Sequence, residues 1–145
     1  MDSFRIETLE EIRTYLAHLR YAINNGAIIS FQKTRLVDNN RDIKYTNTYT
    51  MNSLFPDEDP RKVLARELLT LTESNYLRTV KDRRYPDRSE MREFGKVYND
   101  SDEVYIKIRV ELFDPNGAGQ HTTFVMSFHF AENPFSKESF PYKEQ

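Results

Sequence analysis

The chain has 145 residues and a net charge of −2, with 38% hydrophobic residues, 30% charged residues and no cysteine. This length suits one domain with its own core, and the composition is that of a globular protein, not a disordered one. The lack of cysteine excludes disulfides and thiolate metal sites. The slightly acidic balance argues against a protein that coats nucleic acid by bulk charge.

No targeting or membrane-spanning segment is expected. The first residues, MDSFRIETLEEI, are acidic and carry no long apolar run, unlike a signal peptide. The chain also lacks the stretch of about 18 apolar residues that a transmembrane helix needs. We therefore expect a cytoplasmic protein of one domain, residues 1–145, with no cofactor and no metal ion. Residues 131–145 are expected to be a tail that either lies across the body or is loose.

The first predicted element is a helix that starts after Thr8. Thr8 and Glu11 have the spacing of a capping box, and Gly26 stands where a helix stop is expected. Apolar residues recur between them at steps of three and four, which makes one apolar stripe. The stripe consists of Leu9, Ile12, Leu16, Leu19 and Ile23. We expect it to pack on a sheet.

The segment from 27 to 51 is rich in β-branched and aromatic residues, with turn chemistry (DNN) at 38–40. The first interpretation is a hairpin with strands near 27–36 and 42–51. The second is an irregular loop with a single strand.

Helical signals return after this segment. Asp59 can cap a second helix and Pro60 suits its first turn. The residues expected on its buried face are Val63, Leu64, Leu68 and Leu71. The stretch TESNYLRTVKD then suggests a third, short helix capped by Thr72. Its expected buried residues are Tyr76, Leu77 and Val80.

The last part of the chain predicts strands. A basic loop (KDRRYPDRSEMR) leads into one strand, MREFGKVY, and two further strands are joined by the turn DPNGAG. Apolar residues alternate strictly along both of these. They are Val104, Ile106, Ile108, Val110 and Leu112 on the first, and Phe124, Met126, Phe128 and Phe130 on the second. The order predicts an α+β fold, with N-terminal and central helices on one face of a mostly antiparallel sheet and the other face free.

The polar sides of the last two strands face one another if Phe113 pairs with His121. In that register Tyr105 lies opposite His129, and Lys107 lies opposite Ser127. Side chains that are directly opposite have Cβ atoms about 4.5–5.5 Å apart. A phenol, an ammonium and an imidazole would therefore converge on the free face.

This set suits cleavage of RNA without a metal ion. His129 could act as the acid or the base near neutral pH. Lys107 and Arg109 could hold the phosphate, and Tyr105 could orient the phosphate or stack on a base.

The segment from 78 to 96 adds a basic surface. It holds seven lysines and arginines against four acids, a net charge of +3. Aromatic residues are interleaved with them, and on single-stranded RNA cations contact phosphates while aromatics stack on bases. The candidate RNA-binding residues are Arg83, Arg84, Arg92, Lys96 and Tyr98, together with Arg109.

Plainer interpretations stay open. An exposed strand face alternates polar with apolar residues for solubility alone, and a basic loop can be a solvated surface with local ion pairs. His18 and His121 are interpreted as surface residues.

Three strings and their order resemble the MqsR-type mRNA interferase toxins of bacterial toxin–antitoxin modules, which belong to the RelE-like group of small ribonucleases. The strings are LTLTESNYLRTV (69–80), VYIKIRV (104–110) and VMSFHF (125–130). The resemblance covers about residues 60–130. It implies a RelE-like fold, cleavage of mRNA without a metal ion, and a cognate antitoxin as partner.

Carried over by position, the resemblance implies four catalytic positions, which are Arg78, Tyr105, Lys107 and His129. The family has lysine where Arg78 and His129 stand. Its glutamine falls near Gly95 and is missing here. The segment from 27 to 58 is longer than the family needs, and the chain is acidic whereas these toxins are usually basic. The alternative function is a non-catalytic RNA- or protein-binding module, such as an antitoxin- or immunity-like protein.

Overall fold

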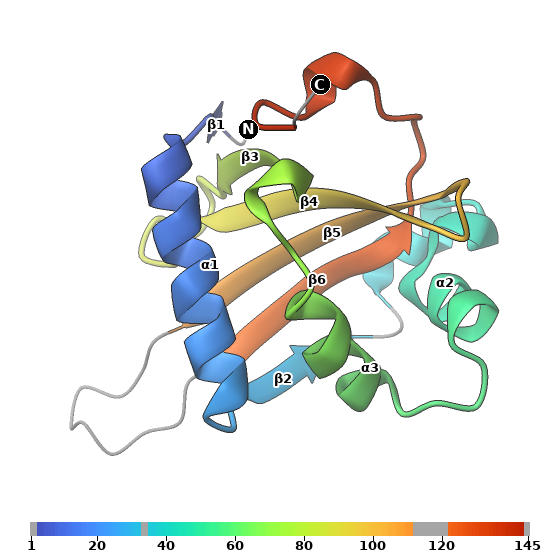
Figure 1. The fold of residues 1–145 in the computed structure, drawn as a ribbon. Helices are drawn as coiled ribbons and strands as arrows, with labels where there is room; N and C mark the ends of the chain where they lie inside the picture. Colours follow the sequence, from blue (N-terminus) through green and yellow to red (C-terminus); the bar gives the residue numbers. More distant parts are fainter. Residues whose placement is uncertain (1–2, 33–34, 112–121, 144–145) are drawn as a thin grey trace.

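The structure is a computed structural model that describes residues 3–32, 35–111 and 122–143. Within these residues the fold is α+β, with three α-helices and one six-stranded sheet (Figure 1). The helices are α1 (Leu9–Asn24), α2 (Asn47–Leu54) and α3 (Pro60–Leu68). The strands are β1 (Ser3–Arg5), β2 (Ile28–Phe31), β3 (Tyr76–Lys81), β4 (Met91–Tyr98), β5 (Asp102–Glu111) and β6 (Thr122–Phe130).

The strands lie in the order β1-β3-β4-β5-β6-β2. Neighbours pair antiparallel except β2, which runs parallel to β6 at one edge. Figure 1 shows α1 and α3 lying across one face of this sheet. The opposite face, called the open face below, carries none of these helices. The α+β arrangement and the mostly antiparallel sheet confirm the sequence prediction.

The two clearest predicted helices form where their caps indicate. The Thr8 side chain accepts from the backbone N–H of Glu11, and the Glu11 carboxylate accepts from the N–H of Thr8, so the capping box is complete. Gly26 follows the helix with a φ of 81°, a conformation that favours glycine. The Asp59 side chain caps α3 with Pro60 in its first turn. Of its predicted stripe, α1 buries Ile12, Leu16 and Leu19, while Leu9 and Ile23 are half-buried; α3 buries its predicted residues Val63, Leu64 and Leu68. Both helices pack against a fully buried layer of the sheet, which includes Phe94, Ile106 and Phe128.

The predicted strand at 42–51 is wrong. A 3₁₀ segment (Ile43–Tyr45) and then α2 occupy this range. The helix completes the edge of β6 beyond the point where β2 stops pairing. The Asn47 side chain accepts from the N–H of Phe128 at 3.0 Å, and the Thr50 hydroxyl accepts from the N–H of Phe130 at 2.8 Å. Polar side chains of a helix thus satisfy backbone groups that a hairpin strand would otherwise have met.

The predicted third helix is also wrong. Its first residues form a short 3₁₀ turn (Glu73–Asn75), and the rest form β3, which pairs with β1 on one side and β4 on the other. Thr79 and Val80 are β-branched and suit a strand. Two neighbouring strands supply backbone hydrogen bonds here, so pairing between distant segments overrides a short helical pattern.

The predicted register of the last two strands is confirmed at its centre, where Tyr105 pairs with His129 and Lys107 with Ser127. The register then shifts by one residue between Lys107 and Ile108. The predicted pair of Phe113 and His121, and the turn around it, lie outside the described residues.

This β-bulge changes the faces of β6. Beyond it Val125 pairs with Ile108 and is buried in the core, while Phe124 pairs with Arg109. The predicted alternation, with Phe124 and Met126 on the core side, is therefore wrong on this part of the strand. An extra residue reverses the inward and outward positions, because side chains alternate with a period of two.

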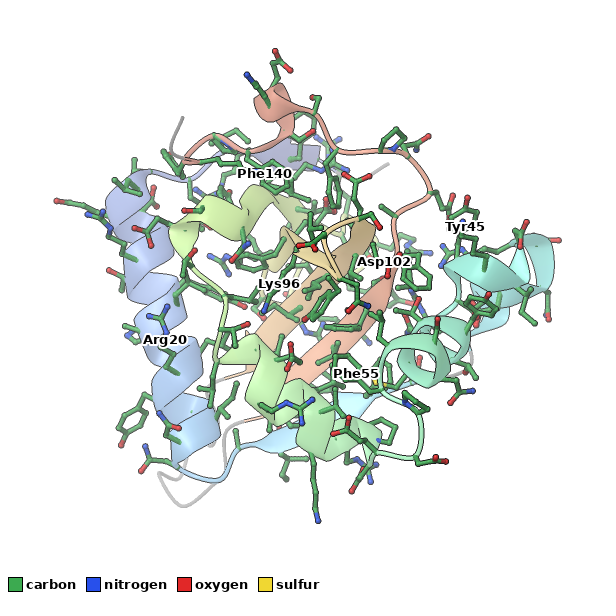
Figure 2. All side chains as sticks on the ribbon, turned by 45° about the vertical axis from the view of Figure 1, so that its right-hand side comes forward. Arg20, Tyr45, Phe55, Lys96, Asp102 and Phe140 are labelled. Atoms are coloured by element: carbon green, nitrogen blue, oxygen red, sulfur yellow. The ribbon has the colours of Figure 1, made fainter. Side chains whose placement is uncertain are left out.

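The tail lies against the body as far as it is described. The backbone N–H of Phe135 donates to the Glu103 carboxylate at 3.0 Å, and the Tyr142 ring stacks on Tyr76 with centroids 6.1 Å apart. Phe140, labelled in Figure 2, meets the Phe135 ring edge to face. Over the described ranges, no helix combines the length and the apolar character needed to cross a membrane.

Candidate active site on the open face of the sheet

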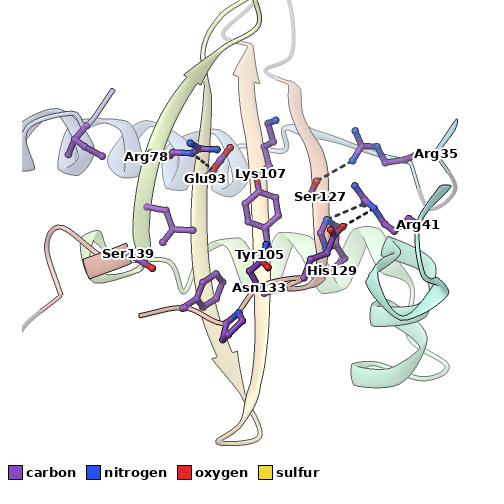
Figure 3. Close-up of a pocket in the computed structure, with 16 residues that line it drawn as sticks. Arg35, Arg41, Arg78, Glu93, Tyr105, Lys107, Ser127, His129, Asn133 and Ser139 are labelled. Carbon is purple, nitrogen blue, oxygen red and sulfur yellow. Dashed lines mark hydrogen bonds and ion pairs between the residues drawn. The ribbon is translucent and has the colours of Figure 1, made fainter. Parts of the chain in front are cut away.

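The open face is hollowed into a cavity of about 640 Å³ (Figure 3). Its floor is formed by side chains of β3 to β6. One wall comes from the segment that leads from β2 to α2, and another from the tail. The charged residues that line it are Arg35, Arg41, Arg78, Glu93, Lys107 and Glu132. The lining therefore holds four cations against two carboxylates, a surplus of positive charge that suits an anionic ligand.

A row of polar side chains crosses the floor from strand to strand. Arg78 on β3 pairs with Glu93 on β4, Glu93 with Lys107 on β5, and Lys107 with Ser127 on β6. The Arg78 Nε lies 2.9 Å from Glu93 Oε1. Glu93 is only 4% exposed, so this ion pair places a carboxylate group at the bottom of the cavity.

Lys107 stands in the middle of this row. Within the part of the chain that the structure describes, its ammonium makes no hydrogen bond and no ion pair. Arg78, by contrast, already has Glu93 as a partner. Lys107 is therefore the cation of the floor that is most available to a ligand.

A second row lies beside the first and contains Gly95, Tyr105 and His129. The Tyr105 and His129 rings are 5.4 Å apart between centroids. Burial raises the pKa of Tyr105, and the neighbouring Glu93 carboxylate raises it further. The phenol therefore keeps its proton at neutral pH and acts there as a hydrogen-bond donor.

Gly95 gives the tail room to approach the sheet. A Cβ atom built at this position would lie 2.8 Å from Phe135 Cε2 and 3.0 Å from Phe140 Cε1. The two aromatic rings thus rest directly on the backbone of β4. This contact fixes the tail as a wall of the cavity next to Tyr105.

His129 lies in the cavity but is 4% exposed, and both ring nitrogens have partners. Nδ1 lies 2.9 Å from the Phe130 carbonyl oxygen, and Nε2 lies 3.4 Å from Arg41 Nη1. Burial lowers the pKa of His129, and the charge of Arg41 lowers it further. The imidazole is therefore neutral at pH 7, and in this arrangement it supports Arg41 more readily than it moves a proton.

Three residues of the site were not identified from the sequence. Arg35 and Arg41 flank a 3₁₀ segment (Leu36–Asn40) within the range interpreted as a hairpin, and no local pattern marks them as site residues. In the sequence, Glu93 is only one of the acids within a basic segment. Strand alternation alone places Glu93 on the same face of β4 as Gly95. That face is the open one, because Glu93 pairs with Lys107 of β5.

Three predicted RNA-binding residues lie on the helix side of the sheet and do not line the cavity. Arg92 makes two hydrogen bonds of 2.9 Å to the buried Glu7 carboxylate. Lys96, labelled in Figure 2, lies 3.7 Å from Glu67, and the Tyr98 hydroxyl donates to the same carboxylate at 2.8 Å. Each of these side chains ties a strand to a helix or to the segment before α1.

The other predicted RNA-binding residues are outside the cavity. Arg83 and Arg84 are exposed in the connection between β3 and β4, where Arg84 pairs with Asp82 at 3.1 Å. Arg109 lies over the Phe124 ring at 4.6 Å, further along the open face. The structure thus brings together Tyr105, Lys107 and His129, as the predicted strand register implied, and adds Arg78, which the resemblance had named; the other candidates lie apart.

The chemistry of the cavity is that of proton transfer beside an anion. A buried carboxylate can accept a proton, an ammonium and several guanidinium groups can stabilise negative charge, and a protonated phenol can orient a ligand. Comparisons with protein-family models, with curated proteins and with solved structures gave no match to this chain.

Proposed function

We propose that the chain is a toxin-type endoribonuclease that cleaves single-stranded mRNA without a metal ion, at the floor of the cavity. The observation that carries the proposal is the buried Glu93 carboxylate between Arg78 and Lys107, with the Tyr105 phenol beside it. The three strings that resemble the MqsR-type toxins support the same assignment, since two of them contribute β5 and β6.

In the proposed reaction, a carboxylate oxygen of Glu93 takes the proton of the RNA 2′-hydroxyl. The 2′-oxygen then attacks the adjacent phosphorus. Arg78 and Lys107 stabilise the negative charge that builds up on the phosphorane. The bond from phosphorus to the 5′-oxygen breaks, and that oxygen takes a proton from the Lys107 ammonium. The products are a 2′,3′-cyclic phosphate and a 5′-hydroxyl.

The remaining residues position the substrate. Tyr105 keeps its proton and donates a hydrogen bond to a phosphate oxygen. His129 is held neutral between Arg41 and the backbone, so its proposed role is to orient Arg41 and not to exchange a proton. A cognate antitoxin, the partner expected from the resemblance, would cover the cavity with acidic side chains that match its positive charge.

The test is cleavage of a labelled single-stranded RNA by the purified protein in the presence of a chelator. Glu93→Gln and Lys107→Ala are each expected to lower the rate by about a hundredfold or more. Lys62→Ala, an exposed lysine on α3, is the matched control and should cleave like the wild type. Induced expression of the wild type should also arrest bacterial growth, and expression of the Glu93→Gln, Lys107→Ala double variant should not.

The second candidate is a binding module without catalysis. It is favoured by the engagement of both ring nitrogens of His129, the side chain best suited to proton transfer near neutral pH. This candidate is established, and the endoribonuclease proposal is rejected, if the wild-type protein binds single-stranded RNA through Lys107, leaves the RNA intact and does not harm bacteria.

A further inference from the structure

We infer that Arg35, Arg41 and Ser127 form a second phosphate-binding subsite on the β6 side of the cavity. It would hold a phosphate of the bound single-stranded RNA other than the one that is cleaved. The identity of the ligand as RNA rests on the proposed function. The subsite itself rests on the geometry and charge of these side chains.

Both arginines reach into the cavity over the same strand. Arg35 Nη1 lies 3.2 Å from the Ser127 hydroxyl, and Arg41 Nη1 lies 3.4 Å from Nε2 of His129. Figure 3 shows the two guanidinium groups side by side above β6, across Tyr105 and Lys107 from Arg78. Two planar guanidinium groups in this position offer several N–H donors. A guanidinium group binds phosphate with two parallel hydrogen bonds to two of its oxygens.

The charges at this end of the cavity are incompletely matched. Arg41 has a carboxylate partner, since its Nε lies 3.0 Å from Glu132. Arg35 has no ion pair with any carboxylate of the described chain, and its guanidinium donates only to Ser127. Asp38 accepts from the backbone N–H of Arg35, forms a longer ion pair of 4.0 Å with Arg41, and raises the pKa of Arg35 against the larger effect of burial.

Burial and the neighbouring Arg41 make the charged form of Arg35 less favourable, and its pKa shows this. Burial lowers the pKa of its guanidinium, and the charge of Arg41 lowers it further. Holding two like charges together, partly out of water, destabilises the free protein. A bound anion would offset that cost, so the free protein is arranged in advance for an anionic ligand.

This subsite lies at the other end of the polar row from Arg78 and Glu93, the residues proposed to act on the cleaved phosphate. Arg78 and Glu93 lie on β3 and β4, whereas Ser127 lies on β6. At about 4.8 Å between neighbouring strands, the backbone positions of Glu93 and Ser127 are on the order of 10 Å apart. At that separation, two phosphates of one RNA strand can occupy the two ends of the row.

The experiment uses short 2′-O-methyl RNA, which binds but cannot be cleaved, and measures affinity by fluorescence anisotropy. In a set of such ligands, one phosphate at a time is replaced by a neutral methylphosphonate. Wild-type protein should lose about tenfold in affinity at two different positions. Arg35→Ala should bind the unmodified ligand about tenfold more weakly and become insensitive at one of these positions, and Lys107→Ala should become insensitive at the other.

The salt dependence gives an independent measure. Loss of one phosphate contact should reduce the slope of log affinity against log salt by about 0.7 for a single strand. Arg35→Lys keeps the charge but not the planar fork, so it should keep the slope and recover only part of the affinity. Arg61→Ala, an exposed arginine on α3, is the matched control and should behave like the wild type.

The inference is overturned if Arg35→Ala binds every ligand as the wild type does, or if Arg35→Ala and Lys107→Ala lose sensitivity at the same position. It is also overturned if inorganic phosphate binds in an Arg35-dependent way while RNA does not bind at all, because the site would then take a free anion. If the predicted binding pattern holds but the wild type cleaves no RNA, the subsite stands and only the proposed reaction fails.

Discussion

Nη1 of Arg41 lies 3.4 Å from Nε2 of His129, while Nδ1 of the same ring lies 2.9 Å from the Phe130 carbonyl oxygen. A guanidinium group can only donate and a carbonyl can only accept. The imidazole must therefore be neutral, with its proton on Nδ1. His129, which the sequence predicts to be an acid or a base, therefore positions the Arg41 side chain instead.

The contact predicts how stability depends on pH. Burial, and then the charge of Arg41, hold the pKa of His129 below its ordinary value near 6.5. Below about pH 6.5 the imidazole is protonated in the unfolded chain but stays neutral in the folded protein. The contribution of His129 to the free energy of unfolding should therefore be fully present above about pH 6.5 and should fall as the pH decreases below it. Urea unfolding between pH 7.5 and 5.5 measures this fall.

His129→Gln should remove this part of the pH dependence, and His18→Gln, an exposed histidine on α1, should leave it as in the wild type. An equal slope in the wild type and in His129→Gln would show that His129 is not held neutral by the fold.

The contacts of Arg92 predict that its replacement lowers the stability of the protein and leaves RNA binding unchanged. Its guanidinium makes two hydrogen bonds to Glu7, which is 3% exposed, and it also lies over the Tyr15 ring. Arg92→Ala would leave the buried Glu7 carboxylate with only the Thr79 hydroxyl and the exposed Arg5 as partners, at a cost of about 3 kcal/mol. Chemical denaturation measures that cost.

The double variant Glu7→Leu, Arg92→Met should recover most of the stability, since an apolar pair can replace a buried ion pair. RNA affinity should be unchanged in both variants. An Arg92→Ala protein of normal stability that binds RNA poorly would return Arg92 to the RNA-binding surface.

Gly95 predicts a steric coupling between β4 and the tail. A side chain at this position would meet the Phe135 ring at 2.8 Å, so Gly95→Ala must displace that ring. We expect a loss of about 1–3 kcal/mol, the usual cost of overpacking. In the double variant Gly95→Ala, Phe135→Ala the two effects should not add, because the second change removes the closest contacts and leaves only Phe140 near the new methyl group.

A double-mutant cycle from unfolding free energies checks this coupling. Additive effects at Gly95 and Phe135 would mean that the tail does not rest on β4 in solution. The same displacement should open the wall of the cavity beside Tyr105, so a weaker affinity for single-stranded RNA is expected alongside the loss of stability.

The parts of the fold that are marked by strict local periodicity followed from the sequence. The stripe and caps of α1, the Asp59 and Pro60 start of α3, and the alternation along β5 all depend on residues close together in the chain. The pairing of Tyr105 with His129 also followed, because a slip by one residue would have exposed the apolar face of both strands.

Tertiary structure decided the rest, because each remaining feature depends on contacts between segments far apart in the chain. The edge of β6 is completed by Asn47 and Thr50, which made α2 a helix where the composition suggested a strand. The bulge beside Lys107 reversed the faces of Phe124 and Val125. Local patterns carry no record of such partners.

The same division holds for the site. By itself the sequence determined which polar residues of β5 and β6 share a face, because a period of two fixes the side of every residue on a regular strand. Only the tertiary structure decided that Glu93 lies beside them, that Arg35 and Arg41 reach them over β6, and that Arg92 does not. Those positions depend on the order of strands and the path of a connection, which distant contacts determine.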